Sequence, residues 1–166
     1  MTHQKRQLTS ITSSMDATKW HRRVLSVLFI VYLILLFYFL FFSEGFGRTQ
    51  FGEEYRYNLT LFKEITRFIR YRHLLGFKAV FINIAGNVIA FMPLGFFLPT
   101  LHPKKRNGIV VMIHCFFLSL LVEVTQLAFR LGCFDVDDLF LNTLGGLLGY
   151  LTYFIIKTIR NGKDNQ

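Results

Sequence analysis

Residues 24–42 read VLSVLFIVYLILLFYFLFF, nineteen positions without a charged side chain. As an α-helix this run would cover about 28 Å, which matches the hydrocarbon thickness of a bilayer. The basic stretch before it, residues 19–23, resembles the start of a signal peptide. However, the run is too long for a signal peptide, and residues 43–45 (Ser-Glu-Gly) lack the small-residue cleavage pattern. We therefore predict a retained membrane anchor.

Three further apolar runs are long enough to cross a bilayer, at about 79–98, 109–128 and 139–156. Hydrophobic residues make up 52% of the 166 positions and charged residues only 17%, which excludes a disordered chain and argues against a water-soluble globule. We predict an all-α integral membrane bundle of four transmembrane helices. Its expected parts are a basic cytoplasmic segment (1–23), a transmembrane domain (24–156) and a cytoplasmic tail (157–166).

The distribution of Lys and Arg along the chain is typical of a membrane protein. A net charge of +9 could suit a nucleic-acid binder, but much of the basic excess lies beside the apolar runs. Eleven of the 19 Lys and Arg residues fall in the segments 1–23, 99–108 and 157–166. The other eight lie in the remaining connections together with seven acidic residues. The positive-inside rule therefore predicts a multi-pass protein with both termini in the cytoplasm, and no nucleic-acid partner is expected.

The connection between the first two spans contains one amphipathic segment. Apolar residues at 61, 62, 65, 68 and 69 share one helical face, and Thr60 is expected to be the N-cap. Lys63, Arg67 and Arg70 lie on the opposite face. A basic amphipathic helix beside a span lies in the membrane interface or packs over the end of the bundle, and the two are compatible. We predict an extracytoplasmic helix that contacts anionic lipid.

Polar side chains inside the spans are costly and therefore informative. They occur in the second span, in a stripe along the third that begins at Ser119, and at the start of the fourth. With both termini inside, Asn83, Glu123 and Asn142 would lie within about 5–9 Å of the outer surface. The expected polar site comprises Asn83, Asn87, Glu123, Gln126, Arg130, Asp135, Asp138 and Asn142.

Two interpretations of these residues compete. Asn and Gln often join membrane helices by hydrogen bonds, worth about 0.6 kcal/mol each, and small residues allow the helices to pack closely. Convergence of these polar stretches at one depth favours a polar cavity instead, with Glu123 as its ionisable group within a span and Arg130 as the expected partner of Glu123. The small residues Gly86, Gly145, Gly146 and Gly149 are assigned to helix packing. Cys115 and Cys133 fit no metal or disulfide pattern, so no metal and no cofactor are expected.

These residues resemble the VanZ-like family of bacterial membrane proteins. The resemblance covers about residues 55–156 and implies a location in the bacterial cell membrane. The name-giving member is associated with low-level resistance to teicoplanin and related lipoglycopeptides. The family offers no agreed catalytic residues, so the shared positions carry over only as a common site. The resemblance rests on Asn83, Asn87, Phe91, Pro93, Leu94, Gly95, Phe96, Glu123, Gln126, Arg130, Asp135, Asp138, Asn142, Thr143, Gly145, Gly146 and Gly149.

Three functions remain open at this point. The leading hypothesis is a non-enzymatic envelope protein that engages a membrane lipid or a lipid-linked cell-wall precursor headgroup in an outer-leaflet polar pocket. The second is an intramembrane enzyme that uses Glu123 and Asp138 as acid and base. The third is a small lipid transporter, which with four spans would have to act as a homo-oligomer, at least a dimer.

Overall fold

The computed structural model describes residues 2–42, 55–102 and 107–163, and within them the side chains of residues 19–41, 55–102 and 107–162. The basic loop at 104–106 and the end of the predicted tail at 164–166 lie outside the described residues. The elements are α1 (Thr2–Phe42), β1 (Arg56–Asn58), α2 (Lys63–Arg70), α3 (Arg72–Leu75), α4 (Phe77–Leu101), α5 (Gly108–Ala128), β2 (Cys133–Asp135) and α6 (Val136–Lys163).

Four of these helices are long and apolar enough to cross a membrane, namely α1, α4, α5 and α6. The predicted all-α bundle of four transmembrane helices is therefore confirmed. The helices extend beyond the predicted spans, since α1 already begins at Thr2 and α6 continues to Lys163. Hydropathy reports the thickness of the bilayer, whereas a helix continues through polar residues until a terminating signal appears.

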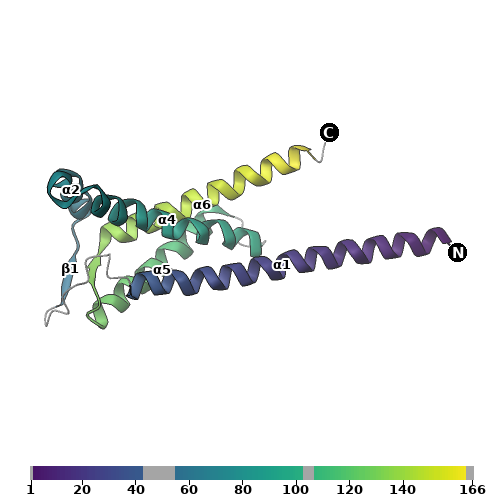
Figure 1. Cartoon of the computed structure of the whole chain (residues 1–166), viewed down its shortest axis with the longest axis horizontal. Coiled ribbons are helices and arrows are strands. Elements are labelled where there is room, and N and C mark those ends of the chain that lie inside the picture. The colour runs from purple at the N-terminus through teal and green to yellow at the C-terminus, as the bar shows by residue number, and fades with distance from the viewer. Residues whose placement is uncertain (1, 43–54, 103–106, 164–166) are drawn as a thin grey trace.

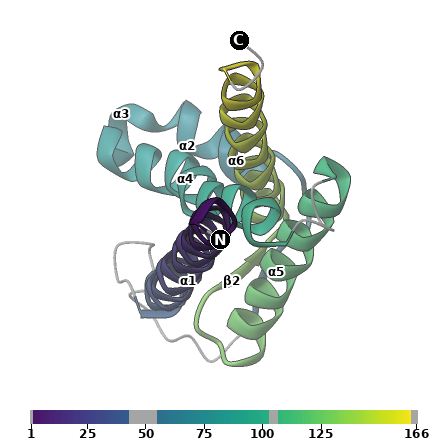
Figure 2. The same ribbon diagram turned by 90° about the vertical axis from the view of Figure 1, so that its right-hand side faces the viewer.

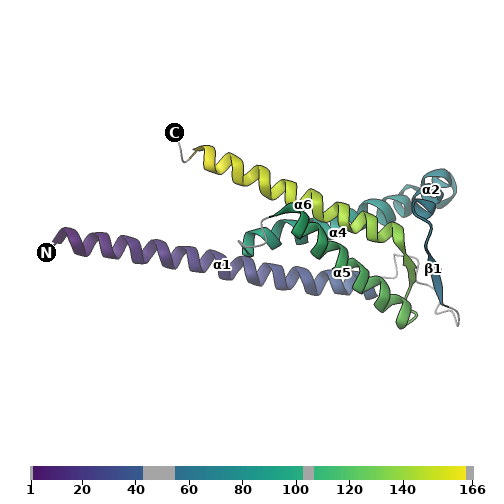
Figure 3. The ribbon, with the colours of Figure 1, turned by 180° about the vertical axis from the view of Figure 1, so that it is seen from behind.

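The bundle is organised around α6. This helix packs mainly against α4 and α5, and α1 packs against α4 (Figure 2). The N-terminal end of α1 and the C-terminal end of α6 lie at the same end of the molecule, and β1 and α2 lie at the other (Figures 1 and 3). We call the end that carries β1, β2 and α2 the mouth.

Glycines allow α6 to approach its neighbours closely. Gly145 and Gly149 lie against the backbone of α4 at Val88 and Met92, so closely that a Cβ atom at either glycine would overlap a backbone carbonyl. Gly146 in turn lies against the Cys115 side chain of α5. In a membrane, where lipid is as apolar as the helices, such backbone contact is a main source of helix association. Gly86 is half-buried in the middle of α4.

A short parallel pairing of β1 with β2 crosses the mouth, with Arg56 opposite Cys133 and Asn58 opposite Asp135. The sequence did not predict this pair, because three residues are too few to show the period-2 alternation of a strand. The pairing joins the connection after α1 to the connection before α6. It therefore places Asn58 and the acidic residues at 135–138 next to each other.

Candidate functional site

A buried aspartate holds α2 in place across the mouth. Asp137 is 1% exposed, and its carboxylate accepts the backbone N–H groups of Phe62, of Glu64 at 2.8 Å and of Ile65 at 3.1 Å. These N–H groups belong to the first turn of α2, where the helix has no internal acceptors for them. Asp137 thus caps α2 from another helix, and its negative charge also suits the positive end of the helix dipole.

The predicted N-cap at Thr60 is wrong. The N-cap position is Phe62, which has a left-handed backbone (φ 64°) and forms no side-chain cap hydrogen bond. Such a conformation is unusual for a bulky residue, and here the Phe62 N–H points to Asp137. The Phe62 ring packs edge-on against Phe140 of α6, at 5.3 Å between centroids. Tertiary contacts with α6 therefore determine where α2 begins.

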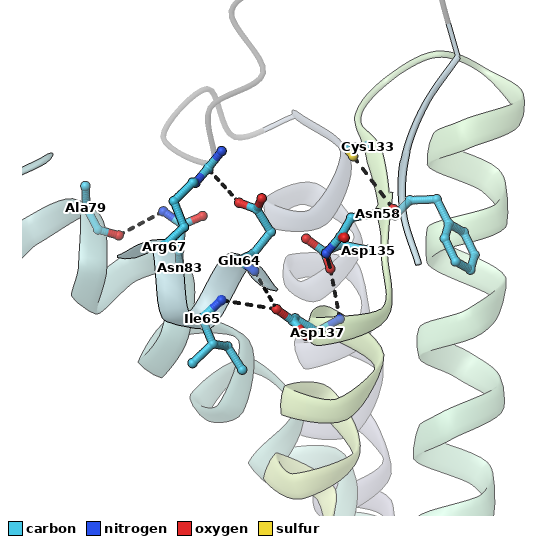
Figure 4. A network of polar contacts seen from close by, with 10 residues as sticks. Asn58, Glu64, Ile65, Arg67, Ala79, Asn83, Cys133, Asp135 and Asp137 are labelled. Carbon is cyan, nitrogen blue, oxygen red and sulfur yellow. Dashed lines mark hydrogen bonds and ion pairs between the residues drawn. The ribbon is translucent and has the colours of Figure 1, made fainter. Parts of the chain in front are cut away.

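The two strands support this cap through a second aspartate (Figure 4). Asp135 Oδ1 accepts the side-chain N–H of Asn58 and the backbone N–H of Asp137, both at 2.9 Å. Asn58 and Asp135 are both buried. Burial raises the pKa of the Asp135 carboxyl above its usual value, while the hydrogen bonds from Asp137 and Asn58 oppose that rise. Asn58, Asp135 and Asp137 thus form a connected chain that ends at α2.

Glu123 joins α5 to the same chain. It is 2% exposed, and its carboxylate accepts the backbone N–H of Asp135 at 2.9 Å. A charged acceptor strengthens such a bond. The membrane-embedded carboxylate therefore fixes β2, which in turn positions Asp135 and Asp137. Arg130, the expected partner of Glu123, lies beyond the end of α5 with a left-handed backbone (φ 55°) and is exposed. Its guanidinium lies 4.7 Å from the centre of the Tyr55 ring.

Two of the remaining polar residues of the spans, Asn87 and Gln126, form contacts between elements, whereas Asn83 bonds within its own helix. Asn87 of α4 donates to the carboxylate of Asp138 in α6, and Asn83, one turn earlier, donates to the Ala79 carbonyl within α4 at 2.8 Å. Gln126 of α5 donates to the Leu40 carbonyl of α1 at 2.8 Å. These bonds connect α6 with α4 and α5 with α1.

A deeper contact joins α5 and α6. Asn142 donates from Nδ2 to the Ser119 hydroxyl at 2.8 Å, and both side chains are almost completely buried. The Asn142 Oδ1 atom is buried without a hydrogen-bond partner. An unsatisfied amide oxygen in the membrane interior is costly. Within the described residues, Asn142 is the one member of the predicted polar set with a buried side-chain atom that lacks a hydrogen-bond partner.

The outward side of α2 carries a cleft with a volume of about 150 Å³. We call it the basic cleft; it is lined by Lys63, Thr66, Arg67, Arg70 and Tyr71. Arg67 also forms an ion pair with Glu64 at 2.6 Å. Three of the five lining residues are cations, so the cleft suits an anionic group at the mouth of the bundle.

The predicted polar set omitted two residues that hold the site together. Asn58 was outside the predicted set because its role depends on the β1–β2 pairing. Asp137 was not separated from its neighbours, because the sequence Asp-Val-Asp-Asp at 135–138 does not reveal which carboxylate faces α2. Among the described residues, no group of three or more His, Cys, Asp and Glu side chains is placed to hold a metal ion.

Comparison with known proteins gives a consistent result. The family model described as VanZ/LLP1 matches residues 29–157. Protein VanZ of Enterococcus faecium is 32% identical over 83 residues, which cover 50% of this chain and 51% of the relative. The chain therefore matches about half the length of this curated relative. No solved structure matches it. These findings confirm the resemblance inferred from the sequence.

Proposed function

The chain belongs to the VanZ/LLP1 family, and we propose that it lowers the susceptibility of bacteria to teicoplanin-type lipoglycopeptides. In this proposal the protein acts from the bacterial cell membrane, with both termini in the cytoplasm and the mouth outside. The mouth engages the headgroup of a membrane lipid or a lipid-linked cell-wall precursor. Lipoglycopeptides act at that surface, so a protein that changes what they meet there would reduce their effect.

The arrangement of Asp137 and α2 carries the proposal. A completely buried carboxylate fastens a helix with a basic cleft across the end of a membrane bundle. Maintaining a buried charge and a left-handed Phe62 is costly for a helix that has no buried residue of its own. This free-energy cost is expected if the function requires α2 to be held in one orientation. In this proposal the residues of the predicted polar site have two roles: the buried ones support α2, and those at the mouth contact the bound headgroup.

The carboxylates favour binding over acid–base catalysis. Glu123 accepts the Asp135 N–H, and Asp138 accepts the Asn87 amide. An acid and a base that act on a lipid-linked substrate need open oxygen atoms within reach of that substrate. Buried carboxylates that accept hydrogen bonds from the protein are better suited to positioning. The proposal therefore places no reaction at this site.

We expect Glu123→Gln to abolish protection against teicoplanin while the protein accumulates to its normal level. Gln retains an oxygen acceptor for the Asp135 N–H, and a neutral amide is cheaper to bury in a membrane than a carboxylate. The substitution removes the charge and replaces the second carboxylate oxygen with an NH₂ group, while the side chain keeps nearly the same shape. The measurement is the teicoplanin susceptibility of a host that expresses each variant, normalised to the amount of protein in the membrane.

Asn87→Ala is the control for this experiment. It removes the side-chain donor to Asp138, and we expect lower abundance with unchanged protection per molecule. Full protection by Glu123→Gln at equal abundance would assign Glu123 to a purely structural role. No change in susceptibility on expression of the unmodified protein would overturn the proposed function itself.

The orientation can be tested by cysteine labelling. In a Cys133→Ser background, a cysteine at Leu59 should react with a membrane-impermeant maleimide in intact cells, because Leu59 is exposed at the mouth. A cysteine at Asn161, exposed near the end of α6, should react only after the cells are opened. The remaining Cys115 is fully buried. The reverse labelling pattern would place the mouth in the cytoplasm.

A further inference from the structure

The basic cleft contains the groups that a phosphate requires. Lys63, Thr66, Arg67 and Arg70 follow one another at helical spacing along a single face of α2, and Tyr71 closes the row. Arginine side chains bind phosphate through paired N–H groups, lysine supplies a point charge, and hydroxyl groups donate single hydrogen bonds. The volume of about 150 Å³ suits one phosphate or a short diphosphate rather than a sugar chain.

The charge balance indicates which kind of phosphate would be preferred. The ion pair with Glu64 partly neutralises the positive charge of Arg67. Lys63 and Arg70 also line the cleft and contribute their positive charges to it. The cleft therefore presents more than one unit of positive charge. A phosphomonoester carries about −1.5 to −2 charges near neutral pH, whereas a phosphodiester carries one. Phosphomonoesters and diphosphates match the cleft better than phosphodiesters do.

The surroundings of the cleft indicate a ligand that belongs to the membrane. The chain continues from α2 through α3 into α4, and on this path Leu74 is 84% exposed and Phe77 is 80% exposed. Figure 2 shows α3 on the outer side of the bundle, away from α5. At the end of a transmembrane bundle, such apolar side chains lie against hydrocarbon, beside the headgroup layer. A lipid could therefore reach the cleft from within the bilayer plane.

We propose that the basic cleft is a lateral binding site for a lipid with a terminal phosphate or diphosphate headgroup. The phosphate lies among Lys63, Arg67 and Arg70, and the hydrocarbon chain lies along Leu74 and Phe77. This inference rests on the proposed function only in placing the mouth at a membrane surface. It specifies the headgroup that the mouth recognises, which the proposed function leaves open.

The test uses the full chain in nanodiscs of phosphatidylcholine that contain a minor fraction of either phosphatidic acid, a phosphomonoester, or phosphatidylglycerol, a phosphodiester. The lipid retained by the protein is measured by native mass spectrometry. We expect preferential retention of phosphatidic acid, with about tenfold weaker retention by Arg70→Gln because it removes a charged hydrogen-bond donor from the cleft. Equal retention of the two anionic lipids would overturn the preference for a phosphomonoester.

Arg72→Gln provides the matched control. Arg72 is exposed, lies on α3 two residues after Arg70, and is not among the residues that line the cleft. The two substitutions remove the same charge, so diffuse attraction to an anionic surface predicts equal losses of up to about fivefold for both. A local site predicts a clearly larger loss for Arg70→Gln. Equal losses would overturn the cleft as a site.

Inorganic pyrophosphate distinguishes a soluble anion from a lipid. We expect it to displace phosphatidic acid only at a large excess, because it gains nothing from Leu74 and Phe77. Displacement at equal concentration would show that the hydrocarbon chain does not contribute and would overturn the lateral lipid site. The susceptibility assay is independent of this result. Selective phosphatidic acid binding without protection would uphold this inference and overturn the proposed function. Protection without selective binding would uphold the proposed function and overturn this inference.

Discussion

Replacing Gly149 with alanine should separate α6 from α4 and greatly reduce the amount of folded protein. A Cβ atom at Gly149 would overlap the carbonyl group of Met92, which is backbone and cannot rotate away. The two helices would have to move apart, which also affects the contact at Gly145, one turn earlier. Overpacking in a close-packed interior costs about 1–3 kcal/mol, and a clash of a Cβ atom with a backbone carbonyl belongs at the upper end of that range.

Gly162→Ala is the matched control. It makes the same change on the same helix, but nothing lies within 4 Å of a Cβ atom at that position. Alanine has a higher helix propensity than glycine by up to about 1 kcal/mol, so this variant should be as stable as the original protein or slightly more stable. The unfolding temperatures of the two variants in detergent are compared by heating each sample and measuring the remaining folded protein by size-exclusion chromatography. Similar unfolding temperatures for both variants would show that α4 and α6 are not held together by backbone contact at Gly149.

The second large effect is expected for Asp137→Asn, which should release α2 from the mouth. Both carboxylate oxygens of Asp137 accept N–H groups from the start of α2. An asparagine offers one oxygen and one NH₂ group. Its NH₂ group would face a backbone N–H at the start of α2, and two donors form no hydrogen bond. Hydrogen bonds to charged groups contribute about 1.5–3 kcal/mol each, and loss of an N-cap costs about 0.5–2 kcal/mol. We expect the anchoring of α2 to weaken by about 2–3 kcal/mol.

Hydrogen exchange of the full chain in nanodiscs measures this effect directly. The amides of Glu64 and Ile65 should exchange about 30- to 150-fold faster in Asp137→Asn, because each 1.4 kcal/mol corresponds to a factor of about ten. Asp135→Asn is the control. Asp135 accepts both of its hydrogen bonds at Oδ1, which an asparagine retains, and burial already disfavours its charge by raising the carboxyl pKa. Unchanged exchange in Asp137→Asn would assign the anchoring of α2 to apolar contacts such as that of Phe62 with Phe140.

The architecture could be predicted because membrane spans depend on a property that is visible in the sequence. An uninterrupted apolar run such as 24–42 has few alternatives to a transmembrane helix, so the four spans and the basic helix between the first two followed from composition and periodicity. The family resemblance was recognisable because its polar and glycine positions recur in fixed order. Helix ends were less predictable, as α1 and α6 show, because polar residues continue a helix without any change in hydropathy.

The hydrogen-bond network of the site could not be predicted because it depends on contacts between segments that are distant in the sequence. The stripe from Ser119 to Arg130 assumes a continuous helix, but α5 ends at Ala128 and Arg130 lies beside Tyr55 instead. Likewise, Asp137 differs from Asp138 only in the direction that it faces at the start of α6. One carboxylate reaches α2 and the other receives the Asn87 amide, and this difference appears only in three dimensions.

The parallel pairing of β1 with β2 has a consequence for biosynthesis. Asn58 and Asp135 are 77 positions apart, and Phe62 and Asp137 are 75 positions apart. Residues 58–62 are therefore synthesised well before the residues to which they bind. Long-range contacts of this kind form late, because a large loop has to close before they can be made. When the ribosome has produced only the first three spans, α2 still lacks Asp137, the residue that caps it. The mouth therefore becomes native only when the fourth span has entered the bilayer.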